Sequence, residues 1–363
     1  MNWLVSLFPT LCPRPIFALF PAFIAGMLGG MAGATASTIE EVSIQSQALG
    51  RPIAVSVYRP ADQAPKAGWP VLYLLHGLDG SNRDWSDLGG IQGTLDRLIK
   101  GGRIHPMMVV MPDAGNSWYV DSADVHGPGN YETALLNDLP KAIEKRFAPH
   151  CERRSRAIAG ISMGGFGALR FALKRPDRYL AVASLSGAIW QNVPVNLAAG
   201  GASWTGGGAY FQQVDPDTII GGVDLPPDGA HFGGAFGAPF DARRFNTANV
   251  FTLLARQLKT GTELPAIYLT VGDNDSHNLW RGSFALYETL MADRQKVEFR
   301  VTDGDHVWSL WRRSIEDALV FVDSKFGAPE LAPPAVAALP DKPHKVANAP
   351  GTSKVASGEA IVK

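Results

Sequence analysis

A serine flanked by glycines at a strand-to-helix boundary constrains this chain more than any other segment. Ser162 lies in Gly160-Ile161-Ser162-Met163-Gly164-Gly165, between a short apolar run at 157–159 and a helix-like run from Phe166 to Lys174. A turn this sharp brings two backbone segments together, and glycine at positions 160 and 164 leaves room for that approach. The Ser162 hydroxyl would then lie near the unpaired N–H groups of a helix N-terminus. The segment predicts a nucleophile elbow; a strand–helix corner with a chance serine is the alternative.

Length and composition favour one large globular domain. The chain has 363 residues, of which 46% are hydrophobic and 18% charged, with a formal net charge of -1. A balance so near neutrality gives no reason to expect nucleic acid or an anionic membrane surface as a partner. Cys12 lies in the apolar N-terminal segment, which leaves Cys151 as a free structural thiol without a disulfide partner. No matched metal ligands surround it, and we expect neither a metal nor an organic cofactor.

Both ends of the chain are predicted to lie outside the fold. Residues 1–36 resemble a signal peptide, with an apolar stretch from Phe17 to Met31 and a small-x-small site at Ala34-Thr35-Ala36. The basic region before it is weak, so an uncleaved anchor is the alternative. We expect cleavage near Ala36, a secreted or periplasmic protein, and no stable membrane insertion after processing. Residues 328–363 are rich in Pro, Ala and Lys without periodicity, and are predicted to form a disordered tail.

Strand and helix patterns alternate across residues 40–327. A hairpin is predicted from Glu41–Ala48 and Ile53–Tyr58, and Glu132–Phe147 is the clearest helix, with Pro140 predicting a kink or a broken first half. Alternation of this kind predicts an α/β catalytic domain with a mostly parallel central sheet, an antiparallel N-terminal hairpin and helices on both faces. The buried strands are expected at 71–75, 107–111, 157–161, 181–185, 266–271 and 297–301.

One segment interrupts this alternation. Residues 191–241 are rich in Gly, Ala and Pro, and they predict an insertion over the catalytic face, either a lid or substrate wall or an unstructured surface excursion. Its aromatic residues are Trp204, Tyr210, Phe211, Phe232 and Phe236.

An acidic pair follows one of the predicted strands. The run 266–271 ends in Gly272-Asp273-Asn274-Asp275, and an acid just beyond a strand can reach across to a catalytic histidine. Asp275 is the preferred candidate because it lies deeper in the loop, and Asp273 fits a turn-capping role. Both remain open on these grounds. A calcium loop is less consistent, because its glycine and terminal acid are missing.

A histidine follows the last strand. His306 lies in a polar loop before a helix predicted at 311–321, so serine, acid and histidine occur in the chain order of α/β-hydrolases. A neutral imidazole there can accept the Ser162 proton. His277 is too close to the acid in sequence to be its usual partner. The remaining histidines precede the serine or lie in the insertion or the tail: His76, His105, His126, His150, His231 and His344.

Two further features complete the candidate site. Gly77 follows a predicted strand, and its turn can aim the backbone N–H of Leu78 at the site, where it would form an oxyanion hole with the N–H of Met163. Trp85, Trp118, Tyr119 and Trp308 are tentative apolar walls for an acyl or aryl group, with ordinary core or rim packing as the alternative.

The sequence resembles the esterase D family of α/β-hydrolases, which includes S-formylglutathione hydrolases, feruloyl and tributyrin esterases, and mycolyltransferase antigens. The resemblance spans roughly Ser43 to Phe326. It implies an acid three residues after a strand-ending glycine, which selects Asp275, and oxyanion-hole roles for Leu78 and Met163. The insertion is longer than in a compact member. The motifs that carry it are Leu74-Leu75-His76-Gly77, Asp84-Trp85, Met111-Pro112-Asp113, Asn116-Ser117-Trp118-Tyr119, Tyr131-Glu132, Asp138-Leu139-Pro140, the elbow, Arg244-Phe245-Asn246 and His306-Val307-Trp308 with Trp311-Arg312.

We therefore expect a serine carboxylic-ester hydrolase that acts on small acyl or aryl esters through Ser162, Asp275 and His306. An acyltransferase acting on envelope lipids or glycans with the same triad is one alternative, because the family includes both reactions. A non-catalytic binding protein on a hydrolase scaffold is another. An exported N-terminus argues against cytosolic formaldehyde detoxification. The sequence does not indicate an oligomeric state or the identity of the ester.

Overall fold

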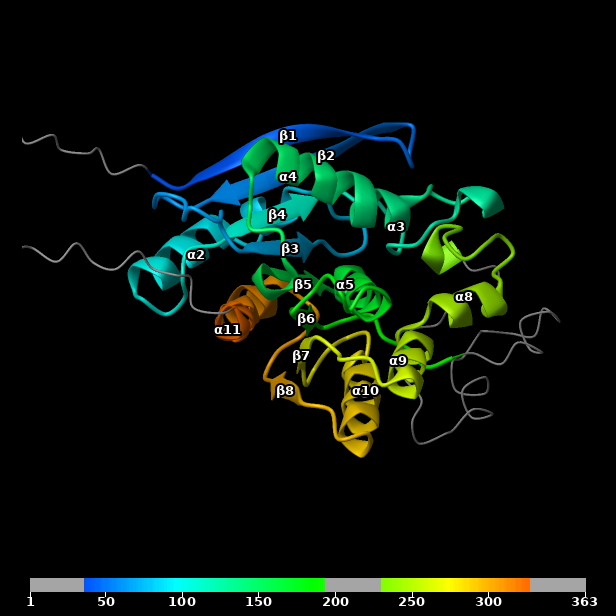
Figure 1. Ribbon diagram of the computed structural model, residues 1–363. Coiled ribbons are helices and arrows are strands. Elements are labelled where there is room, and N and C mark those ends of the chain that lie inside the picture. The colour runs from blue at the N-terminus through cyan, green and yellow to red at the C-terminus, as the bar shows by residue number, and fades with distance from the viewer. Residues whose placement is uncertain (1–35, 193–229, 327–363) are drawn as a thin grey trace, which may run out of the picture.

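An eight-stranded sheet organises the protein. The structure is a computed structural model that describes residues 36–192 and 230–326 (Figure 1). The strand order is β1-β2-β4-β3-β5-β6-β7-β8, with β2 antiparallel to both of its neighbours, β1 and β4, and every neighbouring pair from β4 to β8 parallel. The strands are β1 (Thr38–Ser46), β2 (Arg51–Arg59), β3 (Val71–Leu75), β4 (Met108–Pro112), β5 (Arg156–Ile161), β6 (Ala181–Leu185), β7 (Ala266–Gly272) and β8 (Val297–Thr302).

The predicted fold class is confirmed. All eight expected strands are present, with ends that differ by only a few residues from the expected ones, and the N-terminal hairpin is antiparallel. The expected signal peptide, except Ala36, and the expected tail at 328–363 lie outside the described residues. Within the described ranges, no helix is long and apolar enough to cross a membrane.

Helices cover both faces of the sheet because its central strands are apolar on both sides. In β3, Val71, Tyr73 and Leu75 face one apolar cluster, and the alternate residues Leu72 and Leu74 face the other. The first cluster includes residues of α4 (Leu139–Phe147), α5 (Met163–Lys174), α9 (Val250–Thr260) and α10 (Trp280–Ala292), and the second includes residues of α2 (Ile91–Lys100) and α11 (Trp308–Lys325). Figure 1 shows these two helical layers around the sheet.

The expected helix at 132–147 is interrupted as Pro140 suggested. It consists of α3 (Tyr131–Thr133), a π-helical segment η2 (Ala134–Asp138) and α4. Pro140 lies in the first turn of α4. A backbone N–H there has no acceptor within the helix, so the lack of an N–H in proline costs no hydrogen bond. The shorter elements are α1 (Asp84–Asp87), η1 (Ala123–Val125), η3 (Arg153–Ser155), η4 (Ala230–Phe232) and α8 (Ala242–Ala248).

A buried ion network ties α5 to the loop after β4. Arg170 of α5 is only 3% exposed and donates to Glu132 at 2.6 Å and to the carbonyl of Ala248 at 2.6 Å. It also donates to the carbonyl of Tyr119, and Lys174 pairs with the other oxygen of Glu132. Burial alone would raise the pKa of Glu132, but the charges of Arg170 and Lys174 outweigh it and hold that pKa below its usual 4.5.

Candidate active site

The elbow around Ser162 has the strained backbone that its sequence predicts. Ser162 joins β5 to α5 with φ 51° and ψ -119°, a conformation that non-glycine residues rarely adopt. A Cβ on Gly160 would lie 2.4 Å from the carbonyl oxygen of Gly164, and one on Gly164 would lie 2.5 Å from that of His76. Both contacts involve backbone, so neither position accepts a side chain without moving the turn.

A hydrogen-bonded line runs from Ser162 through His306 to Asp275. Nε2 of His306 lies 3.0 Å from Oγ of Ser162, and its Nδ1 lies 2.8 Å from Oδ2 of Asp275. Asp275 is 3% exposed, and its Oδ1 also accepts the backbone N–H of His277 at 3.0 Å. The carboxylate is therefore held in one orientation, and it favours the tautomer of His306 with the proton on Nδ1.

Asp273 makes different contacts from Asp275. Its Oδ1 accepts the backbone N–H of Gly304 at 3.0 Å and the side-chain amide of Asn274 at 2.9 Å. Asp273 is exposed and joins the loop after β7 to the loop after β8. Of the two acids that the sequence left open, the structure brings Asp275 to His306.

Asp305 contacts the loop of His306 and was not assigned to the site from the sequence. Its Oδ1 accepts the backbone N–H of His306 at 2.6 Å and that of Ser276 at 2.7 Å. These two N–H groups lower the pKa of Asp305, so its carboxylate stays charged across the neutral range. Asp305 thus fixes the loop of the histidine to the loop of the acid. An aspartate beside a loop histidine is a common sequence pattern, so the pattern alone does not predict these two hydrogen bonds.

The predicted oxyanion-hole residues flank Ser162. Met163 is the first residue of α5, so its N–H has no acceptor within its own helix. Within the described ranges, the N–H of Leu78 finds no backbone acceptor. A Cβ on Gly77 would lie 3.5 Å from Cβ of Ser162, which shows how closely the Gly77-Leu78 turn approaches the serine. The oxyanion-hole role of these two N–H groups stays a prediction.

His76 supports this turn from beneath. It is 1% exposed, and burial lowers its pKa, so the ring is neutral at neutral pH. Its Nε2 accepts the backbone N–H of Ala114 at 2.9 Å, which leaves Nδ1 to donate to the carbonyl of Gly77 at 2.7 Å. His76 therefore joins the loops after β3 and β4.

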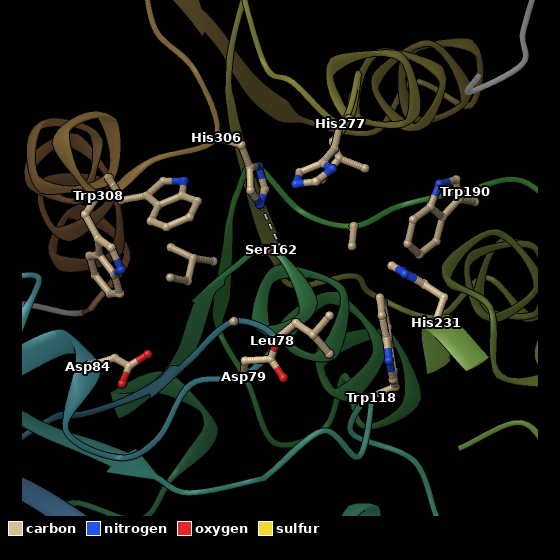
Figure 2. Close-up of a pocket in the computed structure, with 15 residues that line it drawn as sticks. Leu78, Asp79, Asp84, Trp118, Ser162, Trp190, His231, His277, His306 and Trp308 are labelled. Carbon is tan, nitrogen blue, oxygen red and sulfur yellow. Dashed lines mark hydrogen bonds between the residues drawn. The ribbon is translucent and has the colours of Figure 1, made fainter. Parts of the chain in front are cut away.

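Ser162 lines a cavity of about 360 Å³. Figure 2 shows its wall, with Trp308 and Asp84 on one side of Ser162 and Trp118, Trp190 and His231 on the other. The lining residues are Gly77, Leu78, Asp79, Asp84, Trp118, Ile161, Ser162, Ala188, Trp190, His231, His277, Leu279, His306, Trp308 and Trp311.

Only two of the four expected aromatic wall residues line this cavity. Trp118 and Trp308 do so, but Trp85 and Tyr119 are fully buried in the core. Nε1 of Trp85 donates to the carbonyl of Leu75 at 3.0 Å, and the hydroxyl of Tyr119 donates to the carbonyl of His76 at 2.8 Å. The expectation for these two was wrong: they hold the end of β3 and the following turn, and the alternative of core packing applies.

The lining residues that were not assigned to the site from the sequence include Trp190, His231 and His277. Trp190 follows β6, His231 comes from the expected insertion, and His277 follows Asp275 by two residues. The ring of His277 meets that of His306 edge to face at 4.8 Å. Burial lowers the pKa of both His231 and His277, and the nearby His306 lowers that of His277 further.

The described end of the insertion is packed against the site. Phe232 and Phe236 are 1% and 0% exposed, and the ring of Phe232 lies 4.9 Å from that of Trp118. Within residues 230–241, His231 lines the cavity, and Phe232 and Phe236 are buried behind it without lining it. The other three aromatic residues, Trp204, Tyr210 and Phe211, lie outside the described residues.

The remaining chemistry-bearing groups lie elsewhere. Cys151 is free and exposed, with its thiol directed to the carbonyl of Pro149 at 3.0 Å. No group of three or more His, Cys, Asp or Glu residues suited to a metal ion occurs in ranges 36–192 and 230–326.

Comparison with known proteins identifies similar chains. A family model described as putative esterase matches residues 46–322. The esterase Rv1288 of Mycobacterium tuberculosis is 32% identical over 231 residues, which cover 59% of this chain and 49% of that protein. The chain therefore spans about half the length of this relative.

Two further similarities extend over most of the chain. The diacylglycerol acyltransferase/mycolyltransferase Ag85A of Mycobacterium leprae is 24% identical, covering 86% of this chain and 92% of that one. A solved ferulic acid esterase superposes with a TM-score of 0.60 at 24% identity, covering 81% of this chain and all (100%) of that chain. The structural likeness concerns the fold.

Proposed function

This chain belongs to the esterase family whose model it matches over residues 46–322, and from this membership we propose that it is a serine carboxylic-ester hydrolase. The observation that carries the proposal is the line Ser162–His306–Asp275, with separations of 3.0 and 2.8 Å, beside a 360 Å³ cavity. Small acyl or aryl esters are the proposed substrates, because the cavity has room for one small molecule and aromatic rings form much of its wall.

In the proposed acylation, Oγ of Ser162 attacks the carbonyl carbon of the ester while Nε2 of His306 takes the hydroxyl proton. The carbonyl electron pair moves onto oxygen, and the N–H groups of Leu78 and Met163 donate to that oxyanion. Its collapse breaks the bond to the alcohol oxygen, which receives the proton from His306. Asp275 orients the ring and stabilises the imidazolium.

Deacylation repeats these roles with water. His306 takes a proton from water as the water oxygen attacks the acyl-enzyme carbonyl, and the same two N–H groups stabilise the second oxyanion. Collapse breaks the bond to Oγ of Ser162, which recovers its proton from His306. The acid product leaves and the free enzyme is restored.

The direct test replaces the nucleophile. Ser162→Ala is expected to abolish hydrolysis of p-nitrophenyl acetate and labelling by a fluorophosphonate probe while the melting temperature stays near that of the wild type. Ser309→Ala is the matched control, because Ser309 is exposed and lies three residues after His306. Labelling that persists in Ser162→Ala refutes the assignment. An unlabelled wild-type protein favours a non-catalytic binding protein on the same scaffold.

Acyl transfer to an alcohol is the second candidate function. The similarity to the Ag85A mycolyltransferase over 86% of this chain favours it. Transfer uses the same acyl-enzyme, with an acceptor hydroxyl in place of water. Mass spectrometry of the products formed with and without a sugar or glycerolipid acceptor distinguishes the two, because only transfer yields a new ester of the acceptor.

Export from the cytoplasm is also a proposal. It rests on the apolar stretch from Phe17 to Met31 and the small residues before Ser37. N-terminal sequencing of the protein recovered from its native host tests it, with a first residue close to Ser37 expected and an intact Met1 counting against it.

A further inference from the structure

The last strand of the sheet has an open edge. β8 ends the strand order and pairs with β7 alone within the described ranges, so one side of its backbone has no strand partner there. The carbonyl of Thr302 accepts the N–H of Asp273 on the β7 side. Because backbone groups alternate along a strand, those of Val297, Phe299 and Val301 point away from β7. An open edge of this kind is a template for pairing with another strand.

Apolar side chains are exposed beside this edge. Of the six large hydrophobic side chains that are exposed in ranges 36–192 and 230–326, three belong to α10 or β8: Phe284, Met291 and Val301. Phe284 and Val301 are 45% and 54% exposed. The ring of Phe299 lies 6.4 Å from that of Phe284 and 5.5 Å from that of Tyr287, so β8 and α10 present one apolar surface. Figure 1 shows these two elements together at the lower border of the molecule.

The charges of β8 select one way in which this edge can pair with itself. In an antiparallel pair, residues directly opposite each other lie on the same face, so two copies of β8 can pair only about an axis centred on a residue. A centre at Glu298 or at Arg300 would oppose two like charges. A centre at Phe299 places Glu298 of each copy opposite Arg300 of the other. It also places Val297 opposite Val301. Opposite charges stabilise a strand pair and like charges destabilise it, so the centre at Phe299 is favoured.

The ion pair within β8 can be exchanged for two ion pairs between copies. Nη2 of Arg300 lies 3.0 Å from Oε2 of Glu298, and the two side chains are 50% and 43% exposed. An ion pair this exposed contributes little to stability, so its exchange costs little. Nζ of Lys325 approaches Oε1 of Glu298 only to 4.0 Å. The flanking Lys296 would lie opposite Thr302, which adds no contact between like charges.

We propose that β8 binds β8 of a second copy of this chain, antiparallel and centred on Phe299, and so joins two sheets into one. The two copies of α10 then lie on the same face of the joined sheet, where they cover Phe284 and Val301. Both copies use the same surface, so the association closes at a dimer and does not propagate. This association does not depend on the proposed ester hydrolysis.

Charge reversal tests both the surface and the register. Sedimentation velocity of the purified full-length protein over a wide range of concentrations is expected to show a monomer–dimer equilibrium. Glu298→Arg alone opposes arginines across the interface, and Arg300→Glu alone opposes glutamates. Each change is expected to raise the dissociation constant of the dimer at least about tenfold. Asp62→Arg is the matched control, because Asp62 is exposed in the loop after β2, and it should leave the constant unchanged.

Mixing the two single variants provides the sharpest measurement. Glu298→Arg and Arg300→Glu are expected to associate with each other about as tightly as two wild-type chains, because every arginine then faces a glutamate. The double variant Glu298→Arg/Arg300→Glu should dimerise with itself for the same reason. Melting temperatures identify any variant that fails to fold. Val301→Lys is a further variant at an exposed position, and it should weaken the dimer by placing a charge against the apolar Val297 of the other copy.

Three results overturn the proposal. The first is a wild-type protein that is monomeric at every concentration. The second is a dimer that both charge reversals and Val301→Lys leave intact, because another surface then holds it. The third is a mixture of the two single variants that remains monomeric, because the register centred on Phe299 is then wrong.

Discussion

The carboxylate of Asp275 lies 2.8 Å from Nδ1 of His306, although 31 residues separate them in the chain. Asp273, two residues earlier, instead accepts the N–H of Gly304 and has no part in orienting the imidazole. The two acids therefore allow a comparison between a carboxylate proposed to orient the catalytic histidine and one that braces a loop.

Asp275→Asn is expected to lower kcat for p-nitrophenyl acetate by about 10³–10⁴-fold, because the amide favours the wrong tautomer of His306. Asp273→Asn keeps an acceptor oxygen for Gly304 and should retain kcat within about tenfold. Steady-state kinetics on both variants provide the measurement. A larger loss in Asp273→Asn would show that the acid has been misassigned.

The elbow predicts opposite outcomes for two glycine-to-alanine changes. In Gly164→Ala the new Cβ would lie 2.5 Å from the carbonyl oxygen of His76, so the turn and Ser162 must shift and kcat should fall at least about 100-fold. Gly93 lies at an exposed position of α2, and a Cβ there would have nothing within 4 Å, so Gly93→Ala should stabilise the protein by about 0.5–1 kcal/mol. Urea denaturation and ester kinetics test both. Full activity in Gly164→Ala would rule out this account of the elbow.

The contacts of Asp305 predict that replacing it lowers activity, although its side chain bonds to backbone groups and not to the substrate. Asp305→Ala frees the backbone N–H groups of His306 and Ser276, and the resulting freedom of the His306 loop should lower kcat about 10–100-fold with little change in KM. Asp303→Ala is the control, because Asp303 is exposed and it is its backbone carbonyl that accepts the side chain of Arg313. The rate of fluorophosphonate labelling should fall in parallel. Equal rates in the two variants would exclude the positioning role.

The buried network around Glu132 predicts a pH-dependent contribution to stability. The folded-state pKa of Glu132 lies below its usual 4.5, so its stabilisation is fully present above that pH and is lost as pH falls through the folded-state pKa. Glu132→Gln leaves the charge of Arg170 buried, and should lower the unfolding free energy at pH 7 by about 3 kcal/mol.

That deficit should shrink as pH falls from 4.5 through the lower folded-state pKa, because the carboxyl of the folded wild type then becomes neutral. Urea denaturation of both proteins between pH 3 and pH 7 measures it, and roughly equal destabilisation at every pH would contradict the network's role. Glu288→Gln, on the exposed face of α10, should stay within about 0.5 kcal/mol of wild type throughout.

Residues that follow parallel strands could be placed from the sequence. Ser162, Asp275 and His306 come after β5, β7 and β8, whose carboxyl ends meet at one edge of the sheet. Apolar runs locate such strands, and short polar loops leave few residues to choose from. The fold and the meeting of these three side chains followed from that geometry.

The walls of the pocket could not be placed in the same way. Trp85 and Tyr119 are inward-facing because their polar tips reach the carbonyls of Leu75 and His76, a contact that appears only after β3 and its neighbours are assembled. His231 reaches the pocket through the packing of the insertion on Trp118. Loop side chains carry no periodicity that reveals their direction, so these assignments require the tertiary structure.

The separation of 144 residues between Ser162 and His306 has a consequence for folding. In the proposed mechanism the serine gains its base only once β5 to β8 have paired, and contacts so distant in sequence are slow to form during folding. A partly folded chain can contain the elbow while lacking an activated nucleophile. Time-resolved labelling of Ser162 by a fluorophosphonate probe during refolding would therefore report when the last parallel strand pairs form. This time could be compared with that of the earlier collapse.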